Sequence, residues 1–307
     1  MILFAYILMC LIFGTTFLVI KVGLDAGAPP FFTAGIRFLL AGLLLFAWMV
    51  WRRKASFSLL FHKEMILTGA GLTFGTFAGL YWAEQHISSG IAAVLSATGP
   101  LLILLLQLGM YRQRVSRTSL IGCLIGFAGV ILLLMPSMHA DMHGYWLLGC
   151  LAVLAGELCY AFGAVYSKRV IQRFHDTSPI AQNAVQMMYG GAMLLLLSLG
   201  TEQVSLSDLL APQAISSLLY LTIAGSMMGH TIFYWLVAKT NPVFPSTWLY
   251  VSPLIALSLG VFLYNETVPL ASLLGGITII LGILLVNLEN LRQLAGKHLT
   301  GARPARK

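Results

Sequence analysis

An arginine inside an apolar segment is the first residue that could do chemistry. Arg37 lies six residues into the apolar segment 31–51, or about 9 Å from its start at the rise of an α-helix. A charge in the middle of a membrane-spanning helix costs roughly 2.5–3.5 kcal/mol and needs water or a partner. The guanidinium could bind a substrate carboxylate through two hydrogen bonds. Alternatively, it could snorkel outwards or bind carbonyl groups at the end of a span.

Glu157 is the acidic residue that lies deepest in an apolar segment. It is twelve residues into the segment 145–167, about 18 Å from its start and close to the middle of a hydrocarbon core that is ~30 Å thick. Its carboxyl group could carry a proton in coupled transport or bind a substrate ammonium. A pair with Arg37 is the alternative, and it would make both residues structural.

Other polar and aromatic residues inside apolar segments could line a cavity. Gln182, Gln186 and Tyr189 share one face of a helix at this spacing, and such a face could line a cavity or bind a neighbouring helix. His230 could exchange a proton, although a hydrogen bond to a neighbouring helix is the simpler interpretation. The remaining cavity candidates are Thr15, Tyr160, Trp248 and Tyr250.

Two prolines could act as hinges. Pro100 and Pro253 each lie about halfway along an apolar segment. Proline removes a helical hydrogen bond and clashes with the preceding turn, and the freed carbonyl can face a cavity. A static packing kink is the alternative to a hinge.

The sequence predicts no catalytic residue, metal or cofactor. It contains neither H-E-x-x-H nor the P-loop pattern G-x-x-x-x-G-K-[ST]. His139, Asp141 and His143 are close in sequence, but a solvated loop explains them better than a metal site. The four cysteines lie in apolar segments without ligand spacing. An enzyme is therefore not expected.

The composition is that of a membrane protein. Of the 307 residues, 59% are hydrophobic and only 9% are charged, against roughly 25% charged residues in soluble domains. The net charge of +8 comes from short loops without interleaved aromatic residues, so no nucleic-acid partner is expected. Runs this long must be helices, because backbone polar groups need partners inside a bilayer. They lie at 2–22, 31–51, 65–83, 90–110, 118–136, 145–167, 179–199, 214–236, 244–264 and 270–288.

Lysine and arginine are distributed unevenly among the connections between these ten segments. Sixteen follow even-numbered segments, whereas only Lys21, at the end of the first segment, lies towards the opposite side. Cytoplasmic loops of membrane proteins carry an excess of Lys and Arg. We therefore expect an all-α multi-pass protein of the inner (cytoplasmic) cell membrane, with ten transmembrane helices and both termini in the cytoplasm.

The chain matches itself when shifted by 153 residues, without gaps over the third to fifth and the eighth to tenth segments. Tyr81 then meets Tyr234, and Pro100 meets Pro253. Five spans in each half form an odd number, so the second half must enter the membrane from the opposite side. Inverted repeats of this kind are a recurring basis of secondary transporters. The predicted division is 1–136 for the first repeat, 137–144 for an external connector, 145–290 for the inverted second repeat and 291–307 for a basic tail.

The offset is slightly smaller near the start of each half. Lys21 meets Lys168 at 147 residues, and Arg37 meets Gln186 at 149 residues. The two halves thus place a cation and a neutral amide at equivalent positions in the second and seventh segments.

The sequence resembles the EamA family of the drug/metabolite transporter superfamily over essentially its whole length. Phe13-Gly14-Thr15-Thr16-Phe17 and Gly35-Ile36-Arg37-Phe38-Leu39 carry the resemblance, together with Pro100, Pro253 and Tyr264-Asn265-Glu266-Thr267. Phe13 stands where the family usually has Trp, and Gln113 stands where an acid is usual. The resemblance implies ten spans, a central cavity and the transport of small molecules, often the export of amino acids or related metabolites.

Taken together, these features favour a secondary transporter. We expect it to export a small metabolite such as an amino acid by alternating access, with possible proton coupling through Glu157. An intramembrane enzyme and a channel or scramblase are the alternatives. The expected partners are a small-molecule substrate and the lipid bilayer, and the oligomeric state is open.

Overall fold

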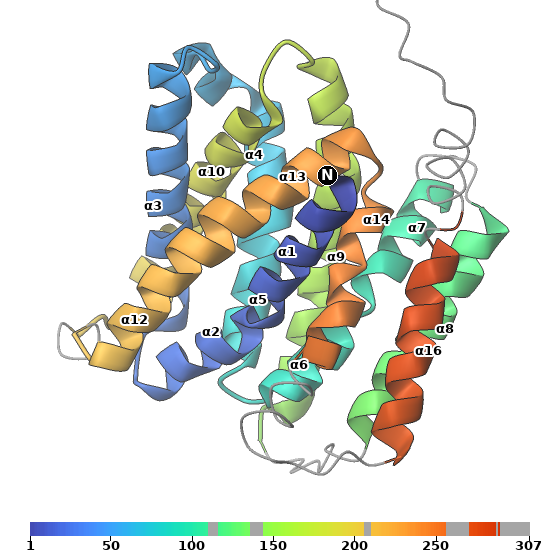
Figure 1. The fold of residues 1–307 in the computed structure, drawn as a ribbon. Coiled ribbons are helices and arrows are strands. Elements are labelled where there is room, and N and C mark those ends of the chain that lie inside the picture. The colour runs from blue at the N-terminus through green and yellow to red at the C-terminus, as the bar shows by residue number, and fades with distance from the viewer. Residues whose placement is uncertain (110–115, 136–143, 206–209, 256–269, 287, 289–307) are drawn as a thin grey trace, which may run out of the picture.

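The computed structural model describes residues 1–109, 116–135, 144–205, 210–255, 270–286 and 288. All regular structure in these ranges is helical (Figure 1). The elements are α1 Ile2–Gly14, α2 Thr16–Asp25, α3 Pro30–Trp51, η1 Phe57–Phe61, α4 Lys63–Gly69, η2 Ala70–Gly75, α5 Thr76–Ala83, α6 Ser89–Ser96, α7 Gly99–Gly109, α8 Arg117–Leu134, α9 Trp146–Arg173, α10 Pro179–Thr201, α12 Pro212–Tyr220, η4 Leu221–His230, α13 Thr231–Lys239, α14 Val243–Ser246 and α16 Leu270–Val286.

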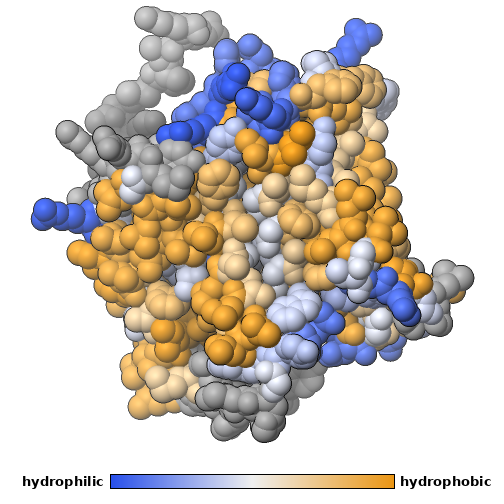
Figure 2. Space-filling model, turned by 180° about the vertical axis from the view of Figure 1, so that it is seen from behind, coloured by the Kyte–Doolittle hydropathy of each residue, from blue (hydrophilic) through white to orange (hydrophobic). Residues whose placement is uncertain are grey.

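Six helical stretches in the described ranges are long and apolar enough to cross a membrane. Three shorter apolar helices accompany them, at Arg117–Leu133, Val243–Ile255 and Leu273–Val286. The outer surface is rich in exposed Leu and Ile side chains, as on the outer faces of α3 and α9, and Figure 2 shows a broad apolar band with hydrophilic residues towards both ends. A bilayer provides the solvent that such a surface needs. The six stretches are 2–25, 30–51, 89–109, 146–173, 179–201 and 212–239.

Several of the apolar helical segments, including residues 63–83 outside these six stretches, are interrupted rather than uniform. η2 and η4 are π-helical, and residues 70–75 shifted by 153 fall inside η4. Single π turns inside α-helices are frequent at functional sites. A second kind of break separates α6 from α7, where Ala97 and Thr98 form a turn. Gly99 and Pro100 begin α7, and the missing N–H and the ring of a proline oppose a continuous helix from the preceding turn.

α9 extends further than its apolar segment predicted. The helix continues to Arg173, six residues beyond the predicted end at 167. Arg173 forms an ion pair with Glu64 at 2.6 Å, and this contact joins the end of α9 to the start of α4. The polar last turns are thus held by a neighbouring helix rather than by lipid.

Glycines bring α8 and α16 into backbone contact at one edge of the molecule (Figure 1). A Cβ atom added to Gly122 would lie 2.8 Å from the Gly282 carbonyl oxygen, and one added to Gly129 would lie 3.0 Å from the Gly275 carbonyl oxygen. No side chain fits in so small a space, so small residues let these helices approach closely.

α3 and α10 pack together in the same way. A Cβ atom on Gly42 would lie 2.7 Å from the Ala184 carbonyl oxygen, and one on Gly191 would lie 2.8 Å from the Gly35 carbonyl oxygen. The remaining helices are arranged around these two close pairs, and they enclose a small pocket.

Candidate substrate-binding site

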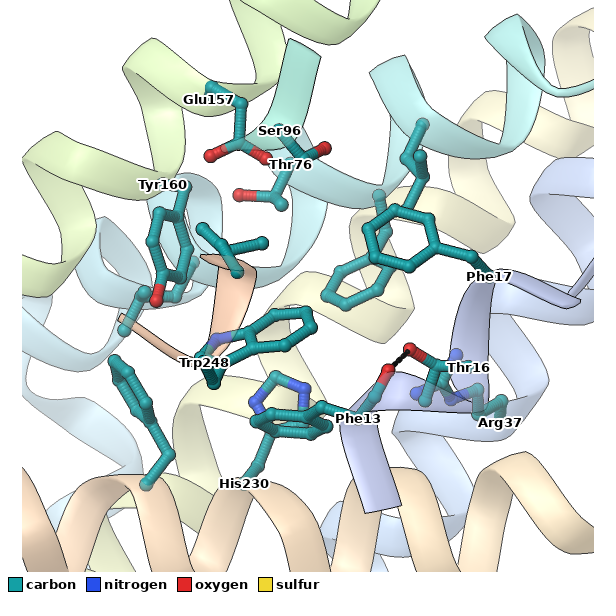
Figure 3. A pocket seen from close by; sticks show the side chains of 15 residues that line it. Phe13, Thr16, Phe17, Arg37, Thr76, Ser96, Glu157, Tyr160, His230 and Trp248 are labelled. Atoms are coloured by element: carbon teal, nitrogen blue, oxygen red, sulfur yellow. Dashed lines mark hydrogen bonds between the residues drawn. The ribbon is translucent and has the colours of Figure 1, made fainter. Parts of the chain in front are cut away.

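The pocket lies among α1, α2, α3, η2, α5, α6, α9, η4, α13 and the helical turns around Trp248. Its volume is about 40 Å³, which is room for about three water molecules at ~10–15 Å³ each. Figure 3 shows its side chains in place. The labelled lining residues are Phe13, Thr16, Phe17, Arg37, Thr76, Ser96, Glu157, Tyr160, His230 and Trp248.

Arg37 is buried on the inner face of α3, with 1% of its surface exposed. Its Nε donates a hydrogen bond to the Ser226 hydroxyl at 2.8 Å, and one terminal nitrogen donates to the Tyr81 hydroxyl at 3.1 Å. The guanidinium also lies over the rings of Phe38 and Phe77, at 4.6 and 5.3 Å from their centroids. Within the described ranges, no carboxylate oxygen lies within 4 Å of it. Its charge is therefore balanced by hydroxyl groups and ring faces alone.

Glu157 is buried on α9, with 5% of its surface exposed. The Ser96 hydroxyl is its hydrogen-bond partner, and its Oε2 atom has no partner among the described residues. A Cβ atom added to Gly99 would lie 2.6 Å from that oxygen. Gly99 therefore leaves the space that the carboxyl group occupies, and an unpaired buried oxygen is costly unless a ligand or proton satisfies it.

Arg37 and Glu157 line the same pocket without touching each other. No ion pair joins them, and in Figure 3 they lie on opposite sides of an aromatic group. Pairing was the structural alternative for both residues, and this geometry does not support it. The pocket offers a donor at one end and an acceptor at the other.

Aromatic rings fill the space between these two residues. The centroids of Phe13 and Trp248 are 4.6 Å apart. The His230 ring packs edge-on against Phe13 at 5.3 Å and against Phe38 at 5.4 Å. Because aromatic rings pack through both faces and edges, they form an apolar constriction between the donor and the acceptor.

The structure brings five of the predicted cavity residues together and places five others elsewhere. The residues at the pocket are Arg37, Glu157, Tyr160, His230 and Trp248. Those elsewhere are Thr15, bonded to Tyr220 at 2.6 Å, Gln182, bonded to the Phe174 carbonyl at 3.1 Å, Gln186, bonded to Thr73 at 2.8 Å, Tyr189, bonded to the Leu60 carbonyl, and Tyr250, bonded to the Cys123 carbonyl at 3.1 Å.

Hydropathy alone did not single out several pocket residues. Ser96 and Thr76 are short hydroxyl side chains, and Phe13 and Phe77 look like any lipid-facing residue in sequence. The signal that could have found Ser96 is its position four residues before Pro100, next to the helix break. The predicted cluster of His139, Asp141 and His143 lies outside the described residues, and no group of metal-ligating side chains occurs within them.

Comparison with known proteins gives consistent results. The model of the EamA-like transporter family matches residues 1–135 and again residues 147–288. The "Uncharacterized inner membrane transporter YedA" of Escherichia coli K12 is 30% identical over 96% of this chain and 90% of its own length. The "Probable amino-acid metabolite efflux pump" of Salmonella typhimurium is 29% identical over 91% of this chain and 92% of its own.

A solved structure shares the fold. It is titled "Crystal structure of protein" and aligns with a TM-score of 0.73 at 19% identity, over 94% of this chain and 97% of that chain. The family and the apolar helices identify a multi-pass membrane transporter for small molecules, not an enzyme. With the family model matching nearly the whole length in two copies, this chain belongs to the EamA-like transporter family.

Proposed function

We propose that the protein is a secondary transporter of a small zwitterionic metabolite such as an amino acid. The observation that carries this proposal is that Arg37 and Glu157 line one pocket. Among the described residues, Arg37 has no carboxylate partner and the Glu157 Oε2 atom has no hydrogen-bond partner. The guanidinium would bind the substrate carboxylate, and the Glu157 carboxylate would bind its ammonium. The substrate carboxylate and ammonium would then serve as the partners that Arg37 and Glu157 do not have among the described residues.

We further propose that the substrate moves outwards across the inner membrane. The printed names of two relatives, an inner membrane transporter and an amino-acid metabolite efflux pump, support this direction and location. The proposed topology has ten spans with both termini in the cytoplasm, as the distribution of Lys and Arg indicates.

Alternating access would use the two halves as inverted repeats. Two hydrogen bonds support this arrangement. Arg37 bonds Ser226, and Thr73 bonds Gln186, both at 2.8 Å. Gln186 is the repeat equivalent of Arg37, and Ser226 is the equivalent of Thr73. Each of the two bonds therefore joins the equivalents of the residues that the other bond joins. The glycine contacts between α8 and α16 are related in the same way. Gly122 approaches the Gly282 carbonyl and Gly129 approaches the Gly275 carbonyl, and Gly275 and Gly282 are the repeat equivalents of Gly122 and Gly129.

The size of the pocket requires a conformational change during transport. A space of about 40 Å³ holds about three waters, which is too little for an amino acid. The contact between Phe13 and Trp248 lies in the path between Arg37 and Glu157. We propose that these rings separate when substrate enters, with the helix breaks in η2, η4 and before Pro100 allowing the movement.

Flux into proteoliposomes tests the function. The purified protein is reconstituted and presented with labelled neutral amino acids under an imposed proton gradient. We expect saturable flux that the gradient accelerates. Glu157→Gln should abolish the acceleration, because an amide cannot bind and release the proton. Asp176→Asn is the matched control, since that carboxylate is 91% exposed.

Each part of the proposal has its own failing result. Gradient-accelerated flux that persists in Glu157→Gln would contradict proton coupling through this residue. Flux of carboxylates that lack an amino group, equal to that of amino acids, would contradict a zwitterion as the substrate.

A further inference from the structure

The Lys168 side chain caps the C-terminal end of α13. The Lys168 ammonium on α9 donates three hydrogen bonds, to the carbonyl oxygens of Val237 at 2.8 Å, Ala238 at 3.1 Å and Thr240 at 2.9 Å. The last carbonyls of a helix lack partners within the helix, and a cation there also favours the helix dipole. All three donors of the ammonium are engaged, so α9 holds the end of α13 firmly.

A second lysine makes a weaker version of this contact at α5. The Lys21 ammonium on α2 donates to one carbonyl oxygen, that of Glu84, at 2.9 Å. It also pairs with Asp25 at 3.2 Å, and the Asp25 side chain is 63% exposed. Exposed ion pairs of this kind contribute little. The end of α5 is therefore held by one strong bond rather than three.

The two lysines occupy equivalent positions in the proposed repeats. Lys168 follows Lys21 by 147 residues, and Val237 follows Glu84 by 153, the offsets found for these regions of the repeat. The bond from Lys21 to Glu84 therefore corresponds to the bond from Lys168 to Val237. The equivalents of the other two carbonyls belong to Gln85 and Ile87, and neither accepts a hydrogen bond from Lys21 among the described contacts.

The two helices held by these lysines both line the pocket, and they end at opposite sides of the molecule. α5 supplies Thr76 and Phe77, and α13 supplies Phe233, three residues after His230. In Figure 1 the chain runs through α4 and α5 towards the lower end and through α12 and α13 towards the upper end. A movement of either helix end would thus open the pocket towards a different side of the membrane.

We propose that Lys168 and Lys21 are two latches that exchange their bonds during transport. In the conformation described here the inner latch at Lys168 is engaged threefold and the outer latch at Lys21 is engaged once. In the opposite conformation Lys21 binds the carbonyls of Glu84, Gln85 and Ile87, and Lys168 retains one bond. This inference rests on the alternating access proposed above and assigns both residues a positioning role.

Thiol labelling from the two sides of the membrane tests the latches without any substrate. The reporter is Thr76→Cys at the pocket, in a background in which Cys10, Cys123, Cys150 and Cys159 are alanine. A membrane-impermeant maleimide is applied to right-side-out or inside-out vesicles. Lys168→Gln should raise the ratio of cytoplasmic to external labelling by at least about tenfold, because the loss of even one charge-assisted hydrogen bond has an effect of that size. Lys21→Gln should lower the same ratio.

Matched variants separate a latch from a general role in stability. Lys239→Gln removes an exposed cation from the same last turn of α13 and should leave the ratio unchanged. Lys168→Arg keeps the charge and several donors and should restore most of the original ratio. If Lys168→Gln fails to fold, Lys21→Gln still tests the proposal from the other side.

The outcomes are distinct from those of the flux assay. Labelling ratios that shift in the same direction, or not at all, in the two glutamine variants overturn the latches. Opposite shifts with no amino-acid flux would support the latches while overturning the proposed substrate.

Discussion

Arg37 and Gln186 occupy equivalent positions in the proposed repeats but differ in their chemistry. Each bonds a hydroxyl group on a π-helical segment of the other half, at 2.8 Å. Only Arg37 lines the pocket, whereas Gln186 is fully buried among Thr73 and Asn183. The charge therefore marks one of two equivalent positions, and this position should set the preference for carboxylated substrates.

Replacing Arg37 tests this preference at the residue scale. We expect Arg37→Gln to raise the KM for an amino acid about tenfold to hundredfold, the range for losing hydrogen bonds to a charged group. The decarboxylated amine of the same substrate should be affected much less. Flux measurements with both compounds provide the comparison. Equal losses for the two compounds would show that Arg37 acts on the fold rather than on the carboxylate.

The sequence predicted both charged residues of the pocket and three of its rings, Tyr160, His230 and Trp248, but not its phenylalanines. Arg37 and Glu157 stand out because charges inside apolar segments are rare. Phe13, Phe17 and Phe77 line the pocket but do not stand out in the sequence, because lipid is as apolar as the interior of a helix bundle. Hydropathy consequently cannot tell a ring that faces a pocket from one that faces acyl chains.

At the scale of elements, six of the ten predicted apolar segments correspond to helices that are long and apolar enough to cross a membrane. The interruptions of the helices were predicted only partly. The prolines indicated kinks, and a break does occur just before Pro100. The π-helical segments η2 and η4 were not predicted, since Gly, Thr and Ala residues are compatible with both α and π geometry. Close contacts with neighbouring helices accompany the π-helical segments, as at Gly71, where an added Cβ atom would lie 3.0 Å from the Cys159 carbonyl oxygen.

The contact between α8 and α16 gives a prediction about stability. A Cβ atom on Gly282 would lie 2.5 Å from the Gly126 backbone nitrogen, whereas one on Gly200 would meet nothing within 4 Å. Gly282→Ala should therefore destabilise the protein by about 1–3 kcal/mol through overpacking. Gly200→Ala should be neutral or slightly stabilising, because alanine favours a helix. Thermal unfolding in detergent measures both, and a Gly282→Ala variant as stable as the parent would contradict the close packing.

At the scale of the whole molecule, the proposed topology predicts which loops face which compartment. Gln85, between α5 and α6, and Lys54, after α3, are both exposed. In the cysteine-free background, Gln85→Cys should react with an impermeant maleimide only from outside the cell, and Lys54→Cys only from inside. The proposed topology places one span between these two residues. If both cysteines reacted from the same side, this topology would be wrong, and so would the proposed inverted arrangement.

The narrow pocket also has a consequence for the cell that carries this protein. About 40 Å³ between packed aromatic rings cannot hold a continuous file of water across the membrane centre. Protons and small ions therefore have no wet path through the pocket in this conformation. Transporter molecules in this conformation would therefore not leak ions through the pocket, and the membrane potential would be maintained in the absence of substrate.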